Sequence, residues 1–150
     1  MIEGLIPDLD WHLVLRHLRD LVLAYLLAIP IGWDREVQQR TAGLRTFPLV
    51  AVAACGYALI GFTVLDSSDA QARIMQGLIT GIGFIGGGAI LKGGGTVHGT
   101  ATASSLWATG AIGLAVASHR FEIAILVSIM TFLTLRFLKP LSKASPASEE

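Results

Sequence analysis

Long apolar stretches alternate with short polar ones along this chain, and they predict helices rather than strands. Five apolar segments cover most of the sequence: Leu21–Ile31, Phe47–Leu65, Ile74–Leu91, Ala101–Ala117 and Phe121–Phe137. A helix needs about 20 mostly apolar residues to cross a bilayer, and four of these segments approach that length. We therefore predict an all-α fold, a polytopic transmembrane helical bundle with five spans.

The first apolar segment is the shortest. Extending it back to Leu13 gives enough length but includes four polar residues: Arg16, His17, Arg19 and Asp20. In a five-span bundle these residues lie at the membrane interface, where arginine side chains extend toward water. The alternative is an amphipathic surface helix over Asp10–Asp20 followed by a short span, which leaves four spans across the membrane.

Composition supports a membrane protein. The chain is 53% hydrophobic and 15% charged, whereas soluble domains carry about 25% charged residues. We predict one transmembrane domain over residues 1–140 and a disordered polar tail over residues 141–150. The net charge is zero, so no nucleic-acid partner is expected. The single cysteine, Cys55, lies within the second segment and cannot form an intrachain disulfide.

The distribution of basic residues predicts an orientation. If the loop after the first span is cytoplasmic, seven of the 11 Lys and Arg residues lie on the cytoplasmic side. Positive residues favour that side. We expect the N-terminus outside and the C-terminus inside.

The third segment lies in a run that is rich in glycine, GLITGIGFIGGGAILKGGG over Gly77–Gly95. Each glycine inside a helix costs about 1 kcal/mol relative to alanine, but small residues let membrane helices approach closely. Gly77 and Gly81 form one smooth helix face, and Gly83 and Gly87 form another. We predict that these faces pack within one subunit or in a homodimer.

An alternative for the same run gives it a polar role. A helix broken at Gly86, Gly87 and Gly88 exposes backbone carbonyls to a polar cavity, as in transporters. Independently of this alternative, we expect Gly93–Gly95 to form a flexible loop into the fourth segment. The match of Gly81–Gly86 to G-x-G-x-x-G does not indicate dinucleotide binding, because no preceding strand or acid about 20 residues later accompanies it.

A charged cluster follows the first segment: Asp34, Arg35 and Glu36, then Arg45 and Thr46. The C-terminal end of a helix disfavours carboxylates, so the acids need a cation. We predict salt bridges to the local arginines. The alternative is that Asp34 and Glu36 bind a hydrated Mg²⁺. No other cofactor is expected.

The fourth segment begins with hydroxyl side chains. Thr100, Thr102 and Ser105, followed by Trp107, are predicted to pack against neighbouring helices. They can also line a pathway beside the glycine-rich segment. No Ser-His-Asp or Cys-His set is visible, so we predict that the protein is not an enzyme.

Several stretches together resemble the MgtC/SapB family of small bacterial inner-membrane proteins. They follow the order and spacing of that family: Gly32–Glu36, Ala42–Thr46, Arg73–Ile74, Gly81–Gly86, Ala89–Ile90, Thr102–Trp107 and Ala111–Leu114. The chain departs from the family pattern at Asp34, usually Glu, and at Phe47, often His. It departs again at His98–Ala103, where Arg-Gly-Leu-Thr-Thr-Ala is typical.

The resemblance implies four or five helices in the bacterial inner membrane. Longer members of the family add a soluble ACT-like domain, which we do not expect in this chain. It also implies a role in adaptation to low Mg²⁺ or acid stress and in virulence. We therefore expect a non-enzymatic regulatory protein that contacts other inner-membrane proteins and forms a homodimer. The alternative is a transporter or channel for Mg²⁺ or another small solute.

Overall fold

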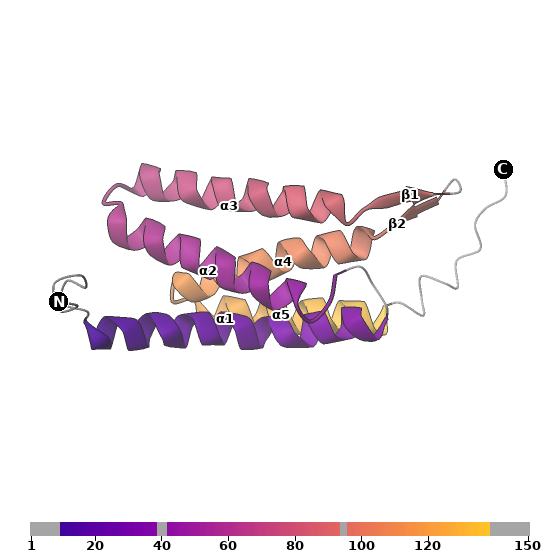
Figure 1. Cartoon of the computed structure of the whole chain (residues 1–150), viewed down its shortest axis with the longest axis horizontal. Helices are drawn as coiled ribbons and strands as arrows, with labels where there is room; N and C mark the ends of the chain where they lie inside the picture. The colour runs from indigo at the N-terminus through magenta and orange to yellow at the C-terminus, as the bar shows by residue number, and fades with distance from the viewer. Residues whose placement is uncertain (1–9, 39–41, 94–95, 139–150) are drawn as a thin grey trace, which may run out of the picture.

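The computed structural model describes residues 10–38, 42–93 and 96–138, which form five helices and one short hairpin (Figure 1). The elements are α1 (Trp11–Val37), α2 (Thr46–Val64), α3 (Ser68–Gly88), β1 (Leu91–Gly93), β2 (Thr96–His98), α4 (Thr100–Ala117) and α5 (Phe121–Phe137). The helices run along the long axis of the molecule. The predicted all-α bundle is confirmed, and the predicted tail lies outside the described residues.

α1 is one uninterrupted helix of 27 residues. Asp10 caps its first turn by accepting a hydrogen bond from the backbone N–H of His12 at 2.9 Å. At 1.5 Å per residue the helix is about 40 Å long, which exceeds the hydrocarbon core of about 30 Å. A separate surface helix ending at Asp20, the alternative raised above, is not what the structure shows.

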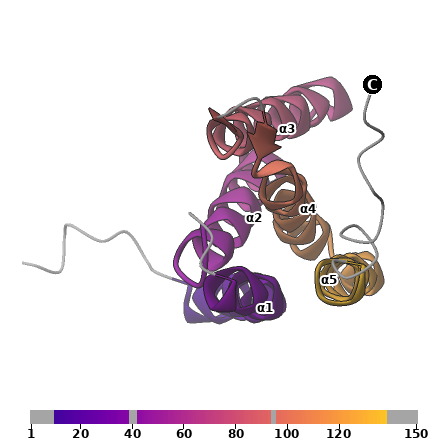
Figure 2. The same cartoon turned by 90° about the vertical axis from the view of Figure 1, so that its right-hand side faces the viewer.

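α4 lies at the centre of the bundle and contacts the other four helices (Figure 2). Its closest approach is to α2. A Cβ atom built on Gly113 would collide with the carbonyl oxygen of Ala51, so only glycine fits there. Leu106, Ile112 and Val116 of α4 are buried with Phe47 of α2 in the hydrophobic core. α2 and α4 are also the two described helices that are long and apolar enough by themselves to cross a membrane.

The glycine-rich run is helical only as far as Gly88. α3 continues through Gly86 and Gly87 and ends at Gly88, where the Ala89 N–H donates to the Gly86 carbonyl at 3.0 Å. The alternative that carbonyls at these glycines line a polar cavity stays a prediction. β1 and β2 then pair antiparallel, with Leu91 opposite His98. The expected flexible loop over Gly93–Gly95 is therefore part of a hairpin at Gly93; Gly94 and Gly95 lie outside the described residues.

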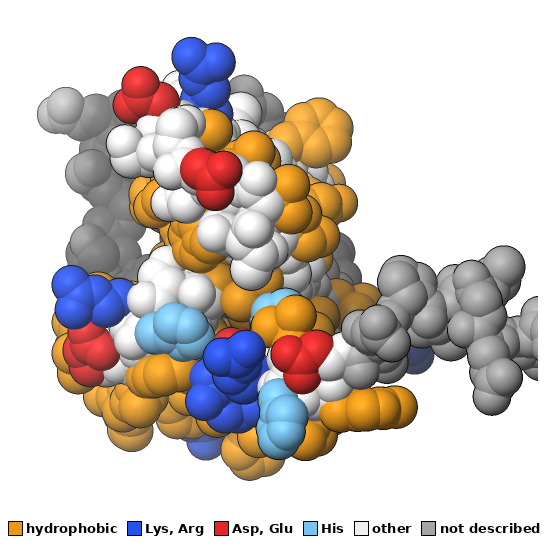
Figure 3. Space-filling view, turned by 90° about the vertical axis from the view of Figure 1, so that its left-hand side faces the viewer, with side chains coloured by type: hydrophobic (Ala, Val, Ile, Leu, Met, Phe, Trp, Pro, Cys, Tyr) orange, Lys and Arg blue, Asp and Glu red, His pale blue; other side chains and the backbone are white. Residues whose placement is uncertain are grey.

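Charged side chains gather at one end of the bundle. Figure 3 views the end where α1 begins and α2 joins α3, and it shows acids, basic residues and histidines with hydrophobic side chains along the flanks. Many large apolar side chains of the helices are exposed, for example Phe84 at 85% and Ile60 at 62%. Apolar flanks with polar ends are typical of a bundle surrounded by lipid.

Candidate functional site

The predicted polar cluster lies at the last turn of α1, where Asp34 and Arg35 are both buried. Arg35 donates to Asp34 Oδ2 through Nε, at 3.2 Å, and through Nη2. The Asp34 side chain is 1% exposed and the Arg35 side chain is 4% exposed. The predicted salt bridge is thus present and solvent-shielded. A cation in the last turn also suits the negative end of the helix dipole.

Gln38 extends this pair by one turn. Its Nε2 donates to the same Asp34 oxygen, Oδ2, at 2.8 Å. Asp34 Oδ1 and Gln38 Oε1 are buried and accept no hydrogen bond from the residues that the structure describes. Asp34 also lines a hollow of about 280 Å³ with Arg136 of α5. Two buried acceptor atoms that lack a donor among the described residues are unusual. Sequence analysis did not single out Gln38, because a glutamine after the end of a helix is common.

Glu36 points to a different part of the structure. Its Oε2 accepts a hydrogen bond from the backbone N–H of Leu44 at 3.1 Å, and a Cβ on Gly43 would collide with it. Glu36 therefore fixes the connection between α1 and α2, while Asp34 pairs with Arg35. The described residues contain no group of three or more His, Cys, Asp or Glu that could hold a metal ion; Mg²⁺ at Asp34 and Glu36 stays a prediction.

Arg45 does not pair with either acid. It is exposed at the start of α2 and makes no ion pair or side-chain hydrogen bond with the residues that the structure describes. Thr46, half-buried, begins α2 through a backbone hydrogen bond to the Gly43 carbonyl, at 3.0 Å. Of the two local arginines predicted to pair with the acids, Arg35 pairs with Asp34 and Arg45 pairs with neither acid among the described residues.

The glycines of α3 differ sharply in their surroundings. Gly86 packs against α4, since a Cβ there would lie 3.2 Å from the Ala103 carbonyl oxygen. The other predicted packing glycines have no atom within 4 Å of a Cβ position: Gly77, Gly81, Gly83, Gly87 and Gly88. Only Ile82 and Gly86 of α3 are buried. Within the described chain, Gly86 packs against a neighbouring helix and the other five glycines do not. Packing of the faces Gly77/Gly81 and Gly83/Gly87 in a homodimer stays a prediction.

The hydroxyls of α4 bond to their own helix. Ser105 Oγ donates to the Thr102 carbonyl at 2.9 Å, and both residues are 2% exposed. The Ser104 hydroxyl donates to the Thr100 carbonyl at 3.0 Å. Trp107 is 56% exposed and therefore only partly packed against other helices. Ser105 lines a hollow between α4 and α5, whereas Gly81 lines one between α2 and α3. The predicted pathway through both sets is therefore not a single cavity.

A buried acid on α1 was missed by sequence reasoning. Asp20 is 1% exposed and accepts two hydrogen bonds from Arg19, at 2.9 and 2.8 Å. Leu21 beside it contacts the Gly56 position in the middle of α2. Asp20 is followed by Ala24 and Ala28, both buried, at helical spacing. That spacing was the available signal that Asp20 faces the bundle rather than the interface.

Comparisons with known proteins agree with this architecture. The sequence model of the MgtC family matches residues 21–144. An uncharacterized protein of Synechocystis is 40% identical over 81% of the chain, which corresponds to 52% of that protein. Protein MgtC of Salmonella typhimurium is 37% identical over 79% of the chain and 50% of its own length. A putative magnesium transporter of Escherichia coli, YhiD, is 34% identical over 81% of the chain and 60% of its length.

The match has clear bounds. The chain spans about half the length of the curated relatives it matches. No solved structure matches it. The family model covers both the polar cluster and the glycine-rich helix. The chain therefore belongs to the MgtC family of membrane proteins.

Proposed function

We propose that the protein is a non-enzymatic regulatory membrane protein. It acts by binding another membrane helix on the face of α3 that carries Gly83 and Gly87. The observation that carries this proposal is the sparse packing of α3, in which Ile82 and Gly86 are buried and Gly83 and Gly87 face open space. Glycines one turn apart allow two backbones to approach, and packing of this kind drives helix association in lipid.

Polar side chains on the same face support a protein partner. At 100° per residue, Gln76 and Thr80 lie on the side of α3 that carries Gly83 and Gly87. Both residues are exposed, and the Thr80 hydroxyl donates a hydrogen bond to the Gln76 carbonyl at 2.9 Å. The Gln76 amide makes no hydrogen bond to the described residues. Such amides bond across helix interfaces in membranes, so we name the stripe Gln76, Thr80, Gly83 and Gly87 the outward face.

The first partner that we propose is a second copy of the chain, with other inner-membrane proteins as further partners. Regulation then consists of exchange between these partners in response to low Mg²⁺ or acid. The names of the relatives, Protein MgtC and a putative magnesium transporter, support a link to magnesium. We also propose the orientation with the N-terminus outside, from the distribution of basic residues.

Growth at low Mg²⁺ tests this function. A host that lacks its own MgtC-family gene is complemented with the wild-type chain or with Gly83→Leu/Gly87→Leu. The matched control is Gly77→Leu/Gly81→Leu, which adds the same two side chains on the other face, also in open space. We expect the outward-face variant to lose complementation while its level in the membrane is unchanged. Full complementation by that variant contradicts the proposal.

Cation transport is a second candidate, supported by the buried oxygens Asp34 Oδ1 and Gln38 Oε1, which accept no hydrogen bond from any described residue. Oxygen ligands suit Mg²⁺, but Arg35 already neutralises Asp34, so we rank transport second. Purified protein in liposomes with an internal Mg²⁺ indicator separates the two candidates. Uptake that disappears in Asp34→Asn supports transport, and uptake no faster than in protein-free liposomes supports the regulatory function.

A further inference from the structure

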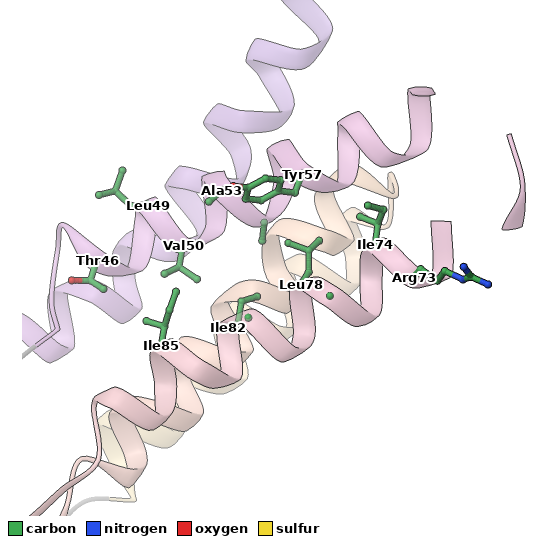
Figure 4. A pocket seen from close by; sticks show the side chains of 13 residues that line it. Thr46, Leu49, Val50, Ala53, Tyr57, Arg73, Ile74, Leu78, Ile82 and Ile85 are labelled. Carbon is green, nitrogen blue, oxygen red and sulfur yellow. The ribbon is translucent and has the colours of Figure 1, made fainter. Parts of the chain in front are cut away.

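A groove with a volume of about 700 Å³ runs between α2 and α3, on the opposite side of α3 from the outward face. Val50 of α2 and Leu78 and Ile85 of α3 point into the space between the two helices (Figure 4). Gly77 and Gly81 widen the groove, because no atom lies within 4 Å of their Cβ positions. An apolar space of this kind is not a site for ordered water.

The length of the groove argues against a spanning helix as its occupant. The groove is closed at one end, where Ile74 Cγ2 lies 3.0 Å from a Cβ position on Gly61. Beyond that contact α2 diverges from α3 and runs toward α1 (Figures 1 and 2). From Ile74 to Ile85 the groove extends about 16 Å along the helix. Half of a hydrocarbon core is about 15 Å, so the groove matches one lipid leaflet.

The closed end carries charge. Arg73 lines this end, is exposed and makes no ion pair or hydrogen bond with any described residue. Its side chain extends away from the apolar lining (Figure 4). Asp69 lies one turn earlier on α3 and is also exposed. A guanidinium beside a carboxylate complements a headgroup that carries both a phosphate and an ammonium.

We propose that this groove binds a zwitterionic phospholipid of the phosphatidylethanolamine class. One acyl chain lies along Gly77 and Gly81, the phosphate meets Arg73, and the ammonium meets Asp69. The groove is lined by none of the four residues of the outward face, so this proposal does not depend on the proposed function.

Native mass spectrometry of the detergent-purified full chain tests the site with added phosphatidylethanolamine. We expect one retained lipid on the wild type and a loss of at least about tenfold in occupancy in Gly77→Leu/Gly81→Leu, equivalent to 1.4 kcal/mol. The matched control is Gly83→Leu/Gly87→Leu, which should retain the lipid. Arg73→Gln changes the closed end of the groove but none of the apolar side chains that line it. It therefore tests the headgroup contact, with an expected loss of about fivefold.

Three outcomes overturn the proposal. The first is equal lipid retention by the two double variants. The second is a preference for phosphatidylglycerol over phosphatidylethanolamine at the same concentration, which would show that Asp69 does not contribute to lipid binding. The third is loss of dimers with retained lipid in Gly77→Leu/Gly81→Leu, which would identify a second copy of the chain as the occupant.

Discussion

Gly113 of α4 lies directly against the backbone carbonyl of Ala51 of α2, with no space for a side chain between the two helices. Gly113→Ala should therefore lower the free energy of unfolding by about 1–3 kcal/mol, because an added methyl group forces the helices apart. The comparison is Gly81→Ala, at a position where an added Cβ meets nothing within 4 Å. That substitution should be neutral or stabilising by up to about 1 kcal/mol.

Thermal unfolding in detergent measures this difference. The two substitutions are chemically identical, so the difference between their changes in the free energy of unfolding isolates the effect of the close approach. A Gly113→Ala protein as stable as the wild type would show that α2 and α4 are not in backbone contact.

Arg35, not Arg45, should control the stability of the polar cluster. Arg35→Ala leaves the buried carboxylate of Asp34 without its cation, which costs about 3–5 kcal/mol when one member of a buried pair is removed. Arg45 makes no ion pair among the described residues. Arg45→Ala should change stability by less than about 0.5 kcal/mol, as is usual for surface substitutions.

Unfolding by denaturant in mixed micelles ranks the two arginine variants. Equal losses of stability in Arg35→Ala and Arg45→Ala would mean that Arg45 also neutralises Asp34.

The pair Arg19 and Asp20 should respond asymmetrically to substitution. The Asp20 side chain is 2% exposed, whereas that of Arg19 is 51% exposed. Arg19→Ala leaves a buried charge without a partner, but Asp20→Asn leaves an arginine that reaches solvent. Arg19→Ala should therefore be the more destabilising by about 1–3 kcal/mol, and Asp20→Asn added to it should recover most of the loss.

A double-mutant cycle on thermal stability gives the coupling between these two residues. If the effects of Arg19→Ala and Asp20→Asn simply add, the ion pair does not compensate the buried acid.

Much of the fold follows from the hydrophobic pattern. The segment predicted at Phe121–Phe137 is α5 itself, and Ala101–Ala117 differs from α4 by one residue at its start. Apolar length is a direct physical requirement in lipid, so it is readable without tertiary information. The predictions were less accurate where caps decide the ends. α3 begins at Ser68 because the Ser67 hydroxyl accepts from the Ala70 N–H, at 3.1 Å, several residues before the apolar run.

The site was only partly predictable. A local pair such as Asp34 and Arg35 is visible in the sequence, because the helix end demands a nearby cation. The sequence could not distinguish the glycines of α3 that pack against α4 from those that face open space, because spacing alone does not show which helix face meets α4. Gly86 contacts Ala103 while Gly83 faces open space, and that difference arises from where α3 crosses its neighbour. The burial of Asp34 Oδ1 and Gln38 Oε1 without a donor among the described residues also arises from tertiary packing, which the sequence does not show.

Disulfide cross-linking in native membranes tests the outward face of α3 most directly. Single cysteines are placed at Gly83 or Gly87, or at Gly77 or Gly81 as controls, in a Cys55→Ala background. Cross-links form only when two Cα atoms come within about 7 Å. We predict oxidised dimers from the positions Gly83 and Gly87 and none from Gly77 and Gly81. Dimers absent from the first pair, or equally abundant from both, would contradict the central claim that a second copy binds there.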